Sequence, residues 1–152
     1  MADVPANEHE QKRTLTIDVF IPNHPDRTGT PIFEKTRDLF IRNNPLAKCE
    51  IDNPDCDHAH PLELHHNVVE WCDSDGADWA KIKLAVPDFD WSSFDPAHPE
   101  TFIDSKWNAN RVLCKKHHTG SDHGIHCMDY PTWQMQKFKR DDFIMTPDEE
   151  KS

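Results

Sequence analysis

The chain has 152 residues, of which 36% are hydrophobic and 30% are charged, a composition typical of one globular domain. Proline (12 residues) outnumbers glycine (4 residues), and no apolar run reaches the length of a bilayer-spanning helix. Collagen-like, coiled-coil and transmembrane chains are therefore excluded. The formal net charge of −11 argues against a protein that coats nucleic acid without selectivity.

Cysteine and histidine usage indicates metal binding. Nine of the 11 histidines fall within 58–126, and the chain has 5 cysteines. An odd cysteine count, in a chain whose first residues are polar and carry no secretory signal, disfavours a secreted disulfide framework. We therefore expect a cytoplasmic protein whose cysteines and histidines bind a metal, with zinc as the first candidate.

The N-terminal part predicts an arm, a strand and a helix. Residues 1–13 are polar and form a flexible arm, and apolar residues alternate with polar ones over 15–19, the pattern of a half-buried strand. Thr30 followed by Pro31 predicts a helix start, and the helix extends over 31–43. We expect one domain from residue 14 onward.

The middle of the chain predicts a short strand and a packed insertion. The strand, 62–64, runs into a histidine pair, and the insertion occupies 67–107 with a helix over Asp78–Ala85. The stretch 67–113 has nine acids against four bases. Its aromatic side chains predict packing and not disorder; they are Trp71, Trp79, Phe89, Trp91, Phe94, Phe102 and Trp107.

The C-terminal part predicts a third strand and two helices. The strand, 112–113, leads into Cys114, a helix starts near Lys115, and Pro131 opens the last helix. We expect the domain to end at 145 and an acidic tail to occupy 146–152. Over 106–140 the chain has seven bases and two acids, a local excess that is compatible with selective phosphate contact.

Three cysteines and one histidine form a first set of metal ligands. Cys49 and Cys56 lie on a turn-rich loop, and Cys114 and His117 have Cys-x-x-His spacing at a helix start. Three thiolates and one imidazole make a closed tetrahedral zinc site. His58 or His60 could replace Cys56 in this set. Cys72 and Cys127 are left as free thiols.

A second set consists of histidines: His65, His66, His118, His123 and His126. Adjacent histidines at the end of a strand point to opposite sides, so one can bind a metal while the other reaches a water. His118 follows a ligand of the first set directly and must point elsewhere on the helix. A site with few protein ligands and open positions is what a catalytic metal needs.

Two short blocks resemble a known nuclease family. The chain reads LELHH over 62–66 and NRVLCKKHH over 110–118. These blocks are similar to the HNH endonucleases of the His-Me finger group, and 117–126 resembles HNH proteins that are common in phage and prophage genomes. The likeness covers 49–126. It implies an α+β fold with a ββα-metal finger core and a structural zinc site, to which the N-terminal strand and helix, the insertion and the C-terminal helix are added.

The resemblance implies a role for each histidine of the second set. His66 takes the position of the general base that activates water. His65 and His118 take the positions of ligands to the catalytic metal. His126, or alternatively His123, completes or supports that site.

The resemblance also requires an asparagine that orients the general base or braces the loop. Asn108 and Asn110 flank the family position, and we assign the role to Asn110. Arg111, Lys115 and Lys116 lie beside the expected helix, where they can hold the flanking phosphates.

These features predict a metal-dependent endonuclease that hydrolyses phosphodiester bonds in double-stranded DNA. It would use a structural zinc and one catalytic divalent metal (Mg²⁺, Mn²⁺, Ni²⁺ or Zn²⁺). One catalytic metal is enough, because a neutral imidazole can take the proton of water at cellular pH. The alternative is a zinc-stabilised binding module without chemistry, whose acidic surface engages a host defence protein or a phage packaging protein. Neither hypothesis involves a membrane.

Overall fold

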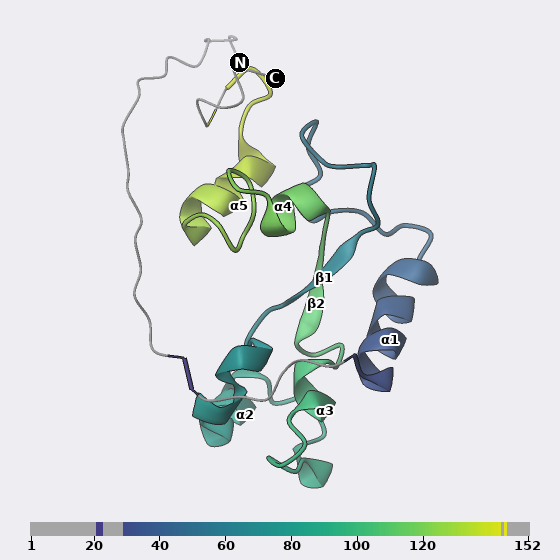
Figure 1. The fold of residues 1–152 in the computed structure, drawn as a ribbon, viewed down its shortest axis with the longest axis vertical. Helices are drawn as coiled ribbons and strands as arrows, with labels where there is room; N and C mark the ends of the chain where they lie inside the picture. The colour runs from purple at the N-terminus through teal and green to yellow at the C-terminus, as the bar shows by residue number, and fades with distance from the viewer. Residues whose placement is uncertain (1–20, 23–28, 144, 146–152) are drawn as a thin grey trace. The chain divides into compact units, whose positions relative to one another are not determined.

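The computed structural model describes residues 21–22, 29–143 and 145 (Figure 1). The predicted arm (1–13), the predicted strand (15–19) and the acidic tail (146–152) lie outside the described residues. No helix in the described part of the chain is both long and apolar enough to cross a bilayer.

The chain falls into two compact units. Of the described residues, unit 1 contains 48–63 and 113–143 with residue 145, and unit 2 contains 21–22, 29–47 and 64–112. The chain passes between them within the strands β1 (Glu63–His66) and β2 (Ala109–Leu113), which form a two-stranded antiparallel sheet. The predicted strands at 62–64 and 112–113 are thus present, and the α+β class is confirmed.

Unit 1 is built from a long loop and two helices, α4 (Lys115–Thr119) and α5 (Tyr130–Phe138). Asp129 caps α5 by accepting from the backbone N–H of Thr132. Trp133 is buried and its Nε1 donates to the carbonyl of His117 at 2.8 Å, which fixes α5 against α4. The core that results consists of Cys49, Ile51, Leu113, Cys114 and Trp133.

Unit 2 begins with the predicted helix, which is α1 (Pro31–Arg37) followed by a π-helical turn (Asp38–Arg42). Thr30 caps it as expected, because its hydroxyl accepts from the N–H of Phe33. The predicted helix at 78–85 is α2 (Trp79–Ala85), with Asp78 as its cap.

The insertion is packed around aromatic rings, as predicted. All seven tryptophans and phenylalanines named above lie in one cluster with Val69, Ile82 and Ile103. The sequence did not predict the short helix α3 (Glu100–Ile103) or the 3-10 turns Trp71–Gly76 and Trp91–Ser93. They are too short for hydrophobic periodicity to reveal them.

Candidate functional sites

Four side chains with ligand atoms converge in unit 1. The Sγ atoms of Cys49, Cys56 and Cys114 lie 3.8, 3.7 and 3.2 Å from Nδ1 of His117, and all four ligand atoms lie within 4.8 Å of one another. A tetrahedral zinc with Zn–S bonds of about 2.3 Å and a Zn–N bond of about 2.0 Å separates sulfur from nitrogen by about 3.5 Å. The group could therefore hold such an ion, and the structure brings the predicted ligands together.

The loop and α4 position these ligands. Cys114 is the N-cap residue of α4, so His117 follows within the first turn of the helix. On the loop, Asp52 has a φ of 49°, a left-handed conformation that aspartate tolerates. The backbone amides of Cys114, Asp52 and Ile51 approach the sulfur of Cys49 and favour its ionised form, against the larger opposing effect of burial.

Backbone amides also reach a second sulfur of the cluster. The N–H of Asp57 donates to Sγ of Cys114 at 3.4 Å. Amide donors around a thiol favour its ionised form, and such contacts outside the ligand shell are typical of metal centres. The surroundings of the sulfurs therefore suit thiolate ligands.

Burial controls the protonation of the cluster. It raises the pKa of Cys49 and raises the pKa of Cys56 to about 12, and the neighbouring sulfurs add to both shifts. Burial also lowers the pKa of His117 to about 4, so this imidazole is neutral at cellular pH. The ring is thus ready to act as a ligand, whereas the thiols ionise only when a cation compensates their charge.

The alternative ligands His58 and His60 do not join the cluster. Among the described residues, the group contains Cys56 as its fourth member. The Nδ1 atom of His60 instead lies 2.8 Å from a carboxylate oxygen of Asp57, on the surface. The choice that the sequence left open is thereby settled in favour of Cys56.

A second arrangement in unit 1 joins two histidines and a glutamate. Nδ1 of His118 lies 2.8 Å from Oε1 of Glu63, and Nε2 of His118 lies 3.2 Å from Nε2 of His126. A carboxylate only accepts, so Nδ1 carries the proton and Nε2 carries the lone pair. Two nitrogens bound to one metal at about 2.0 Å in tetrahedral geometry lie about 3.3 Å apart. The pair is therefore spaced as two ligands of one ion.

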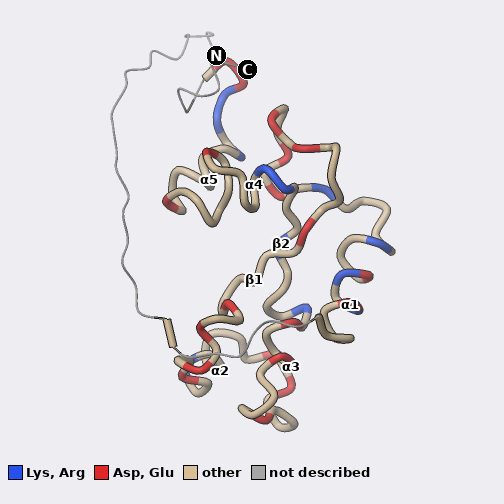
Figure 2. Tube along the Cα trace, in the orientation of Figure 1, with Lys and Arg blue, Asp and Glu red and all other residues tan. Residues whose placement is uncertain are grey.

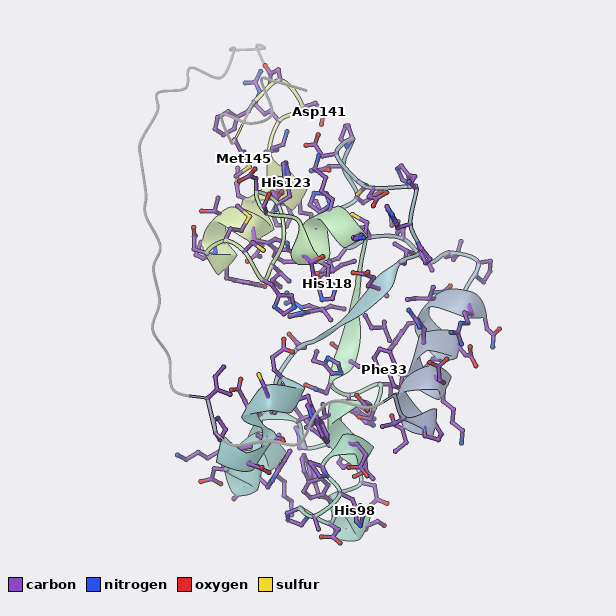
Figure 3. All side chains as sticks on the ribbon, in the orientation of Figure 1. Phe33, His98, His118, His123, Asp141 and Met145 are labelled. Atoms are coloured by element: carbon purple, nitrogen blue, oxygen red, sulfur yellow. The ribbon has the colours of Figure 1, made fainter. Side chains whose placement is uncertain are left out.

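A tight turn after α4 sets this spacing. The backbone N–H of His126 donates to the carbonyl of His118 at 3.3 Å, and the N–H of Ile125 donates to the carbonyl of His117 at 3.0 Å. A Cβ at Gly124 would lie 2.8 Å from backbone atoms of Gly120 and His118, so the turn requires glycine there. Figure 3 shows His118 on α4 and His123 on the segment that follows.

His123 and the two remaining cysteines are not part of either arrangement. The ring of His123 is buried and packs edge-to-face against His117, with centroids 6.0 Å apart. Cys72 and Cys127 are free thiols, as predicted. Of the two alternatives for the outer histidine, His126 is the one that faces His118.

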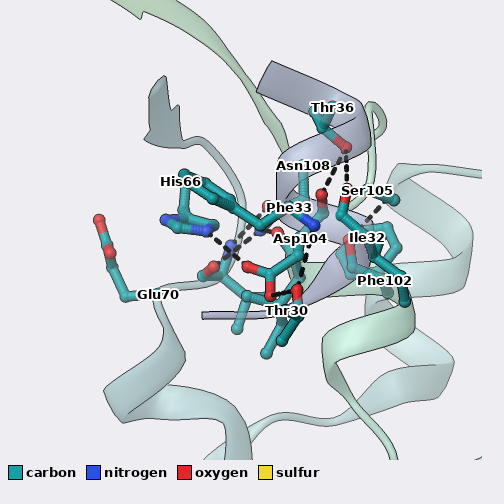
Figure 4. A network of polar contacts seen from close by, with 12 residues as sticks. Thr30, Ile32, Phe33, Thr36, His66, Glu70, Phe102, Asp104, Ser105 and Asn108 are labelled. Carbon is teal, nitrogen blue, oxygen red and sulfur yellow. Dashed lines mark hydrogen bonds and ion pairs between the residues drawn. The ribbon is translucent and has the colours of Figure 1, made fainter. Parts of the chain in front are cut away.

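In unit 2, the predicted general base His66 is held by a buried carboxylate. Its Nε2 lies 3.1 Å from Oδ1 of Asp104, and its ring stacks on Phe33 with centroids 5.8 Å apart (Figure 4). The side chain of His66 is 11% exposed. Its neighbour on β1, His65, is buried with Nδ1 at 3.8 Å from Oε1 of Glu70.

The two asparagines differ sharply in their surroundings. Asn108 is buried, accepts from the N–H groups of Val68 and Val69, and donates to the carbonyls of Val69 and Ile103. It therefore braces the chain segment that follows β1. Asn110 is exposed and donates to the carbonyl of Trp107 at 3.3 Å. A catalytic role for Asn110 stays a prediction.

The predicted phosphate-binding residues lie at the surface or near it. Lys115 is exposed and Lys116 is half-buried, both on α4, and Arg111 is half-buried on β2. The sequence missed Glu63 and Asp104 as partners of histidines. The available signal for Glu63 was its place on the strand that ends in the histidine pair. No sequence pattern indicated that Asp104 pairs with His66, since 38 positions separate the two residues.

No family model, curated protein or solved structure matches this chain.

Proposed function

We propose that the chain is a metal-dependent DNA endonuclease of the HNH type, with a ββα-metal finger core formed by β1, β2 and α4. The observation that supports this most is the Glu63–His118–His126 arrangement, in which His118 lies on the same helix as His117. One side of α4 offers a ligand to a closed Cys3His cluster, and the next residue offers one to a more open site. A structural ion beside an open metal site is the combination that such a nuclease needs.

The Cys3His cluster is the proposed structural zinc site. Zinc there would be held by Cys49, Cys56, Cys114 and His117 and would fasten the 48–63 loop to α4. A site closed by four protein ligands leaves no position for substrate, so its role is stability.

His118 and His126 are the proposed ligands of the catalytic metal, which supplies Lewis acidity at the scissile phosphate when bound. Glu63 holds the proton of His118 on Nδ1 and thereby keeps the Nε2 lone pair available, the usual role of a carboxylate behind a ligating histidine. His65 as a further ligand stays a prediction, which metal titration of His65→Ala tests.

His66 is the proposed general base. A neutral imidazole takes a proton from water and generates the hydroxide that attacks phosphorus. Arg111, Lys115 and Lys116 would hold the flanking phosphates, because charge-assisted hydrogen bonds to phosphate fix the register of DNA without reading its sequence.

Cleavage of a supercoiled plasmid in Mg²⁺, Mn²⁺, Ni²⁺ or Zn²⁺ tests this proposal. We expect cleavage with at least one metal and a loss of about 100-fold or more in rate for His66→Ala, since general-base catalysis contributes on the order of 10²–10⁴-fold. His98→Ala is the matched control, because His98 is an exposed histidine of unit 2 outside the proposed site. Equal rates for wild type and His66→Ala with every metal contradict the proposal.

The acidic surface of unit 2 favours a second candidate, a binding module for a basic protein partner. Six aspartates of the insertion are exposed, and acidic residues recur in α3 and in the segments that precede and follow α2 (Figure 2). These are Asp73, Asp75, Asp78, Asp88, Asp90 and Asp95. This function predicts no cleavage with any metal and a salt-sensitive complex. Asp88→Asn with Asp95→Asn would then weaken that complex, whereas His66→Ala would not.

A further inference from the structure

The general base proposed above is attached to a network that the endonuclease resemblance does not supply. Asp104 is fully buried, and its two carboxylate oxygens are used separately. Oδ1 lies 3.1 Å from Nε2 of His66, and Oδ2 accepts from the hydroxyl of Thr30 at 2.8 Å (Figure 4). One carboxylate thus links the base to the cap of α1.

We propose that Asp104 is a positioning residue for His66, which it holds in the tautomer with the proton on Nε2 and the lone pair on Nδ1. This inference rests on the proposed endonuclease function. An ionised carboxylate only accepts, so the ring nitrogen that faces it must carry hydrogen. Nδ1 is then the atom that takes the proton from water.

The same contact would assist the proton transfer. An O–H bond of water breaks, an N–H bond forms at Nδ1, and His66 becomes an imidazolium. The Asp104 carboxylate remains ionised and stabilises that positive charge across the Nε2–H bond, as an orienting aspartate does for a histidine base elsewhere. Stacking on Phe33 restricts the ring further, because the two planes lie within 23° of parallel.

Among the contacts of Asp104, two are made by threonines of the α1 segment and can be separated by mutation. The hydroxyl of Thr30 binds the carboxylate, whereas the hydroxyl of Thr36 binds the backbone carbonyl of the same residue at 2.7 Å. Both threonines belong to the α1 segment. A variant at Thr30 therefore disturbs the group that orients the base, and a variant at Thr36 loosens only its backbone support.

The test measures single-turnover plasmid cleavage by the full chain together with the ¹⁵N shifts of the His66 ring. For Asp104→Asn we expect a decrease of about 100-fold or more in the cleavage rate, with DNA affinity within about twofold of wild type, because a misoriented base slows the step without weakening binding. The ring shifts should move from the single Nε2–H tautomer to a mixture. Thr30→Val should slow cleavage about three- to tenfold and Thr30→Ser should restore it.

Thr36→Val is the matched control, and we expect it to lower thermal stability while leaving the ring tautomer and the cleavage rate within about twofold. If Asp104→Asn does not fold, the Thr30→Val and Thr30→Ser pair decides the question. If Asp104→Asn and Thr30→Val keep the wild-type cleavage rate and the wild-type His66 tautomer while His66→Ala is inactive, the positioning role of Asp104 is overturned and the endonuclease function stands. Absence of cleavage by the wild type with every metal overturns the endonuclease function, and this inference with it.

Discussion

At the scale of single residues, each histidine of interest owes its state to burial or to one polar neighbour. Burial keeps His117 neutral by lowering its pKa to about 4. Glu63 sets the tautomer of His118, and Asp104 faces Nε2 of His66. These three histidines, of which only His117 and His118 are adjacent in sequence, thus have different chemistry, which follows from burial and from partners far away along the chain.

Removing one sulfur ligand should abolish zinc binding at the proposed Cys3His site. Cys114→Ala leaves two thiols and an imidazole, and we expect loss of bound zinc and a large drop in melting temperature, since structural zinc contributes on the order of 10 kcal/mol of apparent folding free energy. Cys127→Ala is the control, because Cys127 is an exposed free thiol outside the cluster. Zinc analysis and calorimetry of both variants check this, and an unchanged Cys114→Ala protein contradicts the zinc assignment.

Zinc affinity should depend steeply on pH. Without metal, the pKa of Cys49 is raised and the pKa of Cys56 is raised to about 12, so both thiols are protonated at pH 6–8 and must lose their protons on binding. The pKa of His117 is lowered to about 4, so it releases no proton in that range. Because at least two protons are released, the apparent affinity for zinc should fall by about 100-fold or more when the pH is lowered by one unit. Competition with a chelator measures this. An affinity that stays constant from pH 8 to pH 6 would disprove thiolate ligation.

The ligand types were predictable from the sequence, but their partners were not. Cys114 and His117 share one turn, so their spacing alone indicates a common ion. Glu63 and Asp104 are separated from their histidines by 55 and 38 positions, and no local period links them. The choice between Cys56 and His60 likewise depended on the path of a loop, which composition does not determine.

At the scale of elements, α4 and the turn after it carry most of the proposed chemistry. The helix has only five residues, so its own hydrogen bonds stabilise it little. Its position comes from Cys114 at its start, from Trp133 packed against it and from the turn that returns His126 to His118. A short helix in such surroundings can hold two adjacent histidines in fixed, different directions.

Gly124→Ala should disturb the proposed open metal site and leave the proposed zinc site intact. The added Cβ would meet backbone atoms of Gly120 and His118 at 2.8 Å, so the turn must shift and His126 must move from His118. We expect weaker binding of the catalytic metal, measured by titration with Ni²⁺ or Mn²⁺, and one zinc still bound per chain. Gly29→Ala is the control, because nothing lies within 4 Å of its added Cβ. If Ni²⁺ and Mn²⁺ bind Gly124→Ala as tightly as the wild type, His126 is not a ligand of that site.

At the scale of the whole molecule, charge is divided unevenly. The net charge is −11, yet 106–140 has seven bases against two acids. A net negative protein gains little from non-specific attraction to DNA, so the proposed DNA binding would depend on a few well-placed cations.

Lys115→Gln with Lys116→Gln should weaken DNA binding and reduce its salt dependence. Each lost phosphate contact lowers the slope of log affinity against log salt by about 0.9, which gives a reduction of about 1.8 for the pair. Lys81→Gln with Lys83→Gln on α2 is the charge-matched control and should leave the slope unchanged. If the slope of log affinity against log salt is equal for the wild type and the α4 variant, Lys115 and Lys116 do not contact the phosphates of DNA.

The most direct test of the endonuclease proposal is plasmid cleavage by wild type and His118→Ala, compared after both are shown to contain one zinc per chain. We predict that Mg²⁺, Mn²⁺ or Ni²⁺ supports cleavage by the wild type and that the variant, still folded around its zinc, cuts about 100-fold more slowly or not at all. Equal cleavage by the two proteins, or none by the wild type with any metal, contradicts it.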